Sequence, residues 1–201
     1  MKTISEYRVN ALEENTEVIE FDDLHVVVLG TGDGDGTFAG LMEEVTVKRN
    51  IKYDFIDVKK AWIADSDIEI GNVKIRNIDG KNKDCKIEMH NSIVFVRAGA
   101  IETLSSQSMV SSLQDIGFLV VNDLDSMLVC DNKMSNALLL GRNNIPIPRT
   151  SSVPNEESIE DAHQRVGGKF PVIIKTLKGT QGVGVMKIDS MSSLTGVCQS
   201  L

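Results

Sequence analysis

The chain has 201 residues, of which 41% are hydrophobic, 25% are charged and only four are prolines. This composition is typical of a folded globular protein and excludes a disordered or collagen-like chain. The formal net charge of -8 argues against nucleic-acid binding, because proteins that neutralise a phosphate backbone concentrate Lys and Arg.

The sequence carries no sign of export or membrane insertion. Its longest clean apolar run, Val26 to Leu29, is far too short to cross a bilayer, and the N-terminus lacks the apolar stretch of a signal peptide. We therefore expect a cytoplasmic protein without a membrane partner. Cys85, Cys130 and Cys198 are odd in number, widely spaced and form no CxxC pair, so their spacing predicts neither a disulfide framework nor a zinc site.

The first part of the chain alternates short apolar runs with stretches of helical periodicity, which predicts a mainly parallel sheet covered by helices. Between the first two strands, Phe38, Leu41, Met42 and Val45 recur at the spacing of one face of an amphipathic helix. Gly117 is expected to stop a later helix. The predicted elements are strands at 25–29 and 53–58, a small hairpin within 68–87, a strand at 93–96, a helix at 104–116 and a strand at 118–121.

The glycine- and aspartate-rich segment from Gly30 to Gly36 lies between a predicted strand and a predicted helix, as dinucleotide-binding turns do. Its only G-x-G-x-x-[GA] match comes late and ends at Ala39, and the only acidic residue near the end of the next strand is Asp57. A calcium loop at the same place would need a glutamate where Met42 stands. We interpret the segment as a tight turn.

The last third of the chain is predicted to contain helices and two strands. Asp131 is placed to cap a helix from Asn132 to about Arg142, and Pro146 and Pro148 prevent its continuation. The later elements are a helix from Pro154 or Asn155 to Val166, a strand at 171–175, a loop at 178–182, a strand at 183–188 and the beginning of a further helix within 189–201.

The loop between the last two strands has the composition of a phosphate-binding segment. A nucleoside triphosphate needs backbone N–H groups near its phosphates and fixed positive charge to balance them. Lys175 is predicted to end a buried strand, and Gly179-Thr-Gln-Gly-Val-Gly184 follows it with glycines that can approach phosphates without a Cβ. Taken alone, the same residues also fit a plain hairpin turn beside a solvated lysine.

Four segments occur together in the last third: Asp131-Asn-Lys-Met134, Gly141-Arg-Asn-Asn-Ile-Pro-Ile-Pro-Arg-Thr150, Pro171-Val-Ile-Ile-Lys175 and Lys178-Gly-Thr-Gln-Gly-Val-Gly-Val185. In type, order and spacing they resemble the ATP-grasp ligases, and they are most similar to the RimK glutamate ligases. Upstream, the resemblance is one of layout, with a predicted strand that ends at Arg97 where those proteins also have an arginine.

The resemblance implies an α/β fold with two parts. Residues 1–130 would form a pre-ATP-grasp domain around a mainly parallel sheet. Residues 131–201 would form the first α+β subdomain of an ATP-grasp fold, incomplete at its C-terminus. An unfinished sheet edge would favour a second chain or a homo-oligomer as partner.

The resemblance also implies the residues that bind ATP. Lys133 would contact the nucleotide and Lys175 would reach its phosphates, while the glycine-rich loop would close over the β and γ phosphates. The implied loop residues are Gly179, Thr180, Gln181, Gly182, Val183 and Gly184. Magnesium is expected with ATP, but its ligands normally lie further along such chains, so no metal ligand and no catalytic residue is assigned in this one.

The implied activity is ATP-dependent carboxylate–amine ligation, in which glutamate is added to a protein or peptide C-terminus through an acylphosphate. Glutathione-type and D-alanine-type ligation are alternative chemistries on the same scaffold. A non-catalytic module that binds a nucleotide or a partner is the other alternative. We expect the 201-residue chain to have little or no ligase activity alone, as a fragment, as one half of a split enzyme or as a shortened descendant.

Overall fold

The structure is a computed structural model that describes residues 23–32, 37–78, 84–179 and 182–200. The chain divides into two compact units, Met1–Asp123 and Leu124–Leu201. Within the described ranges, no helix is long and apolar enough to span a membrane. Part of the predicted tight turn, Asp33 to Gly36, lies outside the described residues.

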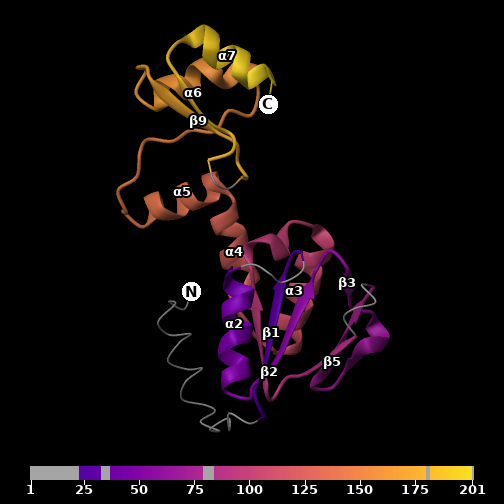
Figure 1. Ribbon diagram of the computed structural model, residues 1–201. Coiled ribbons are helices and arrows are strands. Elements are labelled where there is room, and N and C mark those ends of the chain that lie inside the picture. Colours follow the sequence, from indigo (N-terminus) through magenta and orange to yellow (C-terminus); the bar gives the residue numbers. More distant parts are fainter. Residues whose placement is uncertain (1–22, 33–36, 79–83, 180–181, 201) are drawn as a thin grey trace. The chain divides into compact units, whose positions relative to one another are not determined.

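The first unit is built around a parallel sheet with the strand order β2-β1-β7-β8 (Figure 1). All six residues of the inner strand β1 (His25–Gly30) are buried, as expected for a valine-rich strand that is covered on both faces. The register pairs Val28 with Phe55 on one side and with Phe95 on the other. This sheet confirms the predicted α/β class. Its strands are β1 (His25–Gly30), β2 (Lys52–Asp57), β7 (Ser92–Val96) and β8 (Leu119–Val121).

Two helices, α2 (Thr37–Lys48) and α3 (Leu104–Ile116), cover opposite faces of this sheet (Figure 1). In the strand order, β2 lies on one side of β1, and β8 lies on the other side of β7, so the chain crosses the sheet in opposite directions in these two connections. Because crossovers between parallel strands are right-handed, the helices of the two connections cover opposite faces of the sheet. Helix α3 has the predicted bounds. Thr103 caps it by accepting a hydrogen bond from the Ser106 N–H at 3.1 Å, and Gly117 ends it with φ of 109°.

The inward face of α2 differs from the predicted face. Phe38 and Met42 pack toward the sheet as expected, but Leu41 and Val45 are 55% and 43% exposed. Thr46 is buried instead, and its hydroxyl donates to the carbonyl oxygen of Met42 at 2.8 Å. The helix backbone supplies the hydrogen-bond acceptor that this hydroxyl needs, so threonine can be buried here. The pattern of apolar residues had instead predicted Leu41 and Val45 on the inward face.

The hairpin predicted within residues 68–87 is confirmed and belongs to a larger antiparallel arrangement. Its central strand buries Val73 and Ile75 completely. The connection between β2 and β7 contains β3 (Ala61–Trp62), β4 (Ile68–Glu69), β5 (Asn72–Asn77) and β6 (Cys85–Glu88), with β5 paired to the other three.

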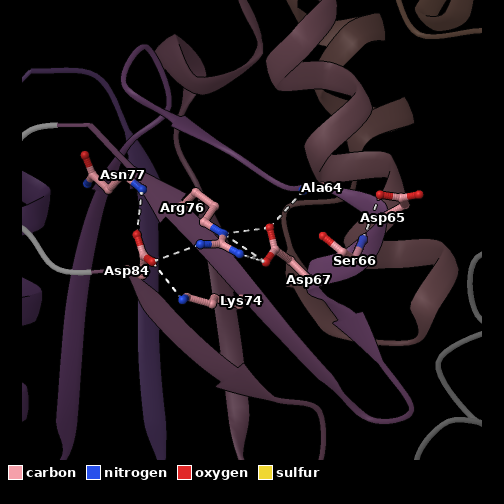
Figure 2. A network of polar contacts seen from close by, with 8 residues as sticks. All are labelled: Ala64, Asp65, Ser66, Asp67, Lys74, Arg76, Asn77 and Asp84. Carbon is pink, nitrogen blue, oxygen red and sulfur yellow. Dashed lines mark hydrogen bonds and ion pairs between the residues drawn. The ribbon is translucent and has the colours of Figure 1, made fainter.

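A network of ion pairs joins β5 to the segments that precede β4 and β6 (Figure 2). Arg76 donates from Nε to the Asp67 carboxylate at 2.9 Å, and its Nη1 lies 3.6 Å from the Asp84 carboxylate. The ammonium group of Lys74 reaches Asp84 at 2.9 Å. Since the Asp67 side chain is only 2% exposed, Arg76 supplies the counter-charge that a buried carboxylate needs.

The second unit has a two-stranded antiparallel sheet of β9 (Val172–Lys175) and β10 (Val185–Ile188). Its core consists of Ile159, Ile188 and Leu194, with further partly buried side chains around them. The helices of the unit are α4 (Leu124–Asp131), α5 (Lys133–Arg142), the 3-10 turn η4 (Glu156–Ser158), α6 (Ile159–Arg165) and α7 (Met191–Ser200). The helix expected within 189–201 is therefore present.

The start of α5 corrects one prediction. Asp131 does not cap this helix, because it is the last residue of α4, which the sequence patterns did not reveal. Asn132 is the cap, and its Oδ1 accepts hydrogen bonds from the N–H groups of Met134 and Ser135, both at 3.0 Å. Asp and Asn cap helices about equally well, so the turn between the two helices decides between them.

Candidate functional site

The glycine loop, residues 178–184, connects β9 to β10 in the second unit. The two strands are paired up to Lys175 and Val185, and the Thr176 N–H then donates to the carbonyl oxygen of Gly184 at 3.0 Å. Strand β10 consequently begins at Val185, two residues later than predicted. Thr180 and Gln181, two of the predicted ATP-binding residues, lie outside the described residues.

Glycine is required in this loop by conformation and by space. Gly179, Gly182 and Gly184 have φ values of 133°, 80° and 72°, in the left-handed region that other residues rarely adopt. A Cβ on Gly184 would also collide with the Thr176 side chain, 2.8 Å from its Cγ2. The backbone of the loop therefore follows a course that only this spacing of glycines permits.

Lys133 is bound directly to the glycine loop. Its ammonium group donates a hydrogen bond to the carbonyl oxygen of Gly179 at 3.0 Å, and its backbone N–H donates to the carbonyl oxygen of Leu177 at 3.0 Å. The cap at Asn132 fixes the first turn of α5 and so aims Lys133 at the loop. Two predicted site residues that are 46 positions apart in the sequence thus come together.

A second link between the same segments involves a lysine that the site prediction left out. The ammonium group of Lys178 lies 3.2 Å from the Asp131 carboxylate, at the end of α4. The two side chains are 59% and 34% exposed, so the pair contributes at most about 1 kcal/mol to stability. Its position in the sequence could have indicated this lysine, since Lys178 directly precedes Gly179, the first glycine of the loop.

Lys175 stands at the end of β9, where the chain enters the glycine loop. The strand was predicted to be buried, but only one of its faces is covered: Ile174 packs into the core, whereas Ile173 is 55% exposed and Lys175 is exposed too. Among the described residues, no hydrogen bond or ion pair joins the Lys175 ammonium group to another side chain. A solvated lysine at this position remains available to a ligand.

The loop is surrounded by more positive than negative charge. Lys133, Lys175 and Lys178 contribute three ammonium groups, and Asp131 is the carboxylate paired with one of them. Lysines together with glycine N–H groups attract phosphate oxygens. In the described part of the second unit, no group of three His, Cys, Asp or Glu side chains is close enough together to hold a metal ion.

Arg97, the arginine at the end of the predicted strand in the first unit, contacts an aromatic ring. Its guanidinium carbon lies 4.2 Å from the centre of the Phe38 ring, above the ring face. This cation–π contact ties the end of β7 to the start of α2.

A comparison with protein families matches residues 130–201 to the RimK-like ATP-grasp domain. Over 152 residues, the chain is 30% identical to a protein of Vibrio vulnificus (strain YJ016) named "Probable alpha-L-glutamate ligase". The match covers 76% of this chain and 47% of the relative, so the chain spans about half the length of that relative.

Solved structures resemble the fold at low sequence identity. A RimK domain ATP-grasp protein from Sphaerobacter thermophilus DSM 20745 gives a TM-score of 0.61 at 18% identity, over 88% of this chain and 58% of that one. Carboxyaminoimidazole ribonucleotide synthase from Aspergillus clavatus, solved in complex with ATP, gives a TM-score of 0.57 at 13% identity, over 89% of this chain and 45% of that one.

Proposed function

Because the chain belongs to the RimK-like ATP-grasp family, we propose that it takes part in the ATP-dependent ligation of a carboxylate to an amine. In such a reaction ATP transfers its γ-phosphoryl group to the carboxylate, and the amine then displaces phosphate to form an amide. Catalysis of this kind depends mainly on positioning and on charge neutralisation.

The second unit supplies the phosphate-binding part of this proposal. Lys133 and Lys175 would contribute positive charge to the nucleotide, and the N–H groups of the loop from Gly179 to Gly184 would hold its β and γ phosphates. Closure of the same loop would keep water away from the acylphosphate. The observation that carries the proposal is the hydrogen bond from Lys133 to the Gly179 carbonyl, because it joins the first predicted lysine to the loop.

Glutamate is our proposal for the amine, and the C-terminus of a protein or peptide is our proposal for the carboxylate. The relative named as a glutamate ligase supports the first of these. The assignment of residues 1–130 to a pre-ATP-grasp domain and of 131–201 to part of the ATP-grasp fold stays a prediction. The same holds for the requirement for magnesium, for a cytoplasmic location and for inactivity of the 201-residue chain alone.

ATP binding tests the proposal most directly. Titration of the purified chain with ATP in a calorimeter should show saturable binding that Lys175→Ala weakens by about 10- to 100-fold, as expected for the loss of a contact to a charged group. Lys187→Ala is the matched control, because Lys187 lies on the neighbouring strand and pairs with Asp189 at 3.0 Å. Equal affinity for wild type and Lys175→Ala would remove Lys175 from the site.

Turnover is measured separately. Phosphate release should require ATP, glutamate and a protein or peptide that offers its C-terminal carboxylate. We expect it after addition of the polypeptide that follows the chain in longer relatives, and little or none from the chain alone. Release that proceeds equally well without glutamate would exclude the proposed amine while leaving nucleotide binding intact.

A further inference from the structure

Three side chains of different chemistry converge in the first unit, whereas the glycine loop belongs to the second unit. His25 begins β1, Asp54 lies in the middle of β2 and Cys85 begins β6. His25 Nε2 is 2.7 Å from Asp54 Oδ2, and Cys85 Sγ is 3.4 Å from the same oxygen. One ligand atom from each residue lies within 4.8 Å of the other two.

The sheet geometry explains the convergence. Asp54 is in register with Val27, and side chains two residues apart on a strand share a face, so His25 and Asp54 point to the same side of the sheet. Cys85 reaches this side from the antiparallel strands that connect β2 to β7. No short sequence motif indicates the cluster, because His25 and Asp54 are 29 positions apart and Asp54 and Cys85 are 31 apart.

The cluster is buried on two sides and open on the third. His25 is 2% exposed and Cys85 is 8% exposed, whereas the Asp54 side chain is 40% exposed. A solvated ion can therefore approach along Asp54, and the two buried side chains are held in place by their strands.

The cluster does not present an activated nucleophile. Burial, together with the charge of Asp54, raises the pKa of Cys85 far above its usual value, so the free thiol stays protonated and unreactive at neutral pH. Burial also tends to raise the pKa of Asp54, but the hydrogen bonds from His25 and Cys85 outweigh it and leave this pKa lowered. An ionised carboxylate thus stands between an imidazole and a thiol.

We propose that His25, Asp54 and Cys85 form a binding site for a zinc-type divalent ion, independent of the ligase function. Nitrogen, oxygen and sulfur ligands of these residue types are the ones that Zn²⁺ takes in proteins. On binding, the thiol releases its proton to solvent. The thiolate and the carboxylate then balance the two positive charges of the ion, and water fills the fourth position on the open side of Asp54.

The required movement is small. Tetrahedral zinc with ordinary bond lengths separates its ligand atoms by about 3.4–3.6 Å. The nitrogen–oxygen distance of 2.7 Å would widen, the sulfur–oxygen distance of 3.4 Å would hardly change, and the nitrogen–sulfur distance would close from at most 4.8 Å. Bound metal would tie β1 and β2 of the parallel sheet to β6 of the antiparallel strands.

Cobalt binding is the direct test, because Co²⁺ replaces Zn²⁺ in such sites and reports its ligands by colour. The tag-free chain, stripped with a chelator, should bind one Co²⁺ and develop a thiolate-to-cobalt charge-transfer band, which added Zn²⁺ bleaches. Zn²⁺ should also raise the melting temperature. If the wild-type chain is folded by circular dichroism but develops no thiolate-to-cobalt band, the proposal is wrong. This result needs no variant.

Variants then identify the ligands. Cys85→Ser should remove the band, while His25→Gln and Asp54→Asn should each weaken Zn²⁺ binding at least about 100-fold, since loss of even an outer-shell partner costs 10- to 100-fold. Cys130→Ser and Cys198→Ser are the controls, because both cysteines lie in the second unit. Metal binding that survives Cys85→Ser, or that is lost in Cys130→Ser, would place the site elsewhere.

Discussion

The ammonium group of Lys133, in the first turn of α5, donates a hydrogen bond to the carbonyl oxygen of Gly179 across 46 positions of sequence. The same lysine is the one that the family resemblance assigns to the nucleotide. In the structure it therefore holds the glycine loop by a contact that a bound phosphate would compete for. This relationship makes Lys133 the most informative residue of the candidate site.

Replacing Lys133 by methionine keeps the aliphatic stem and removes the charge. We expect Lys133→Met to weaken ATP binding by about 10- to 100-fold and to speed hydrogen exchange in the loop, because both the proposed contact to the nucleotide and the bond to Gly179 are lost. Calorimetry and exchange mass spectrometry measure the two effects. The matched control is Lys187→Met. Faster exchange with unchanged ATP affinity would give Lys133 a structural role only.

The glycine loop can be tested by one added methyl group. Gly184→Ala forces alanine to a φ of 72° and brings its Cβ against Thr176, so we expect a loss of about 1–2 kcal/mol from the backbone alone, and weaker ATP binding. Gly196→Ala is the control, because nothing lies within 4 Å of a Cβ there and the residue is inside α7.

The control change should stabilise the chain by up to about 1 kcal/mol, the difference in helix propensity between Gly and Ala. Urea unfolding of both variants measures the contrast. If Gly184→Ala were as stable as wild type and bound ATP equally well, the left-handed conformation at Gly184 would not matter to the loop.

The Arg76 network predicts a particular dependence of stability on pH. The hydrogen bond from Arg76 lowers the pKa of Asp67, so its stabilising effect is full above the unfolded pKa of about 3.9 and is lost as pH falls through the lower folded value. Arg76→Met should therefore be less stable than wild type at pH 7, and the difference should shrink on acidification.

Denaturant unfolding at neutral and acidic pH measures this difference. Lys74→Met is the matched control, because Lys74 pairs with Asp84 and leaves the buried Asp67 carboxylate bound to Arg76. A larger loss of stability in Lys74→Met than in Arg76→Met would contradict the assignment of Arg76 as the necessary counter-charge.

Tyr53 provides a spectroscopic check on the packing of α2 against the sheet. Burial, with smaller contributions from Glu43 and Asp54, raises the pKa of its phenol to about 12, and its hydroxyl donates to the carbonyl oxygen of Ala39 at 3.2 Å. Because the folded pKa is raised, this group stabilises the fold fully below its unfolded pKa of about 10, and the contribution is lost as pH rises toward 12.

Ultraviolet titration of the phenolate should thus show a late step that Tyr53→Phe removes. The Tyr53→Phe variant, titrated in parallel, is the reference. If the step that this variant lacks lay near pH 10, Tyr53 would be exposed and α2 would not pack as described.

The sequence by itself determined the features that depend on neighbouring residues. Gly117 ends α3 as predicted, because a left-handed glycine at the end of a helix is local chemistry. The alternation of apolar runs with helical periodicity was enough to predict the α/β class. The ordered segments from Lys133 to Val185 identified the family that residues 130–201 match, because those motifs follow one another in a fixed order.

Only the tertiary structure decided features that depend on distant contacts. It turned Thr46 rather than Leu41 and Val45 toward the sheet, and it placed Lys133 on the Gly179 carbonyl. It also brought His25, Asp54 and Cys85 together from separate strands. The physical reason is that these residues meet only after helices have packed and strands have paired, and the local spacing of residues in the sequence does not encode contacts across tens of positions.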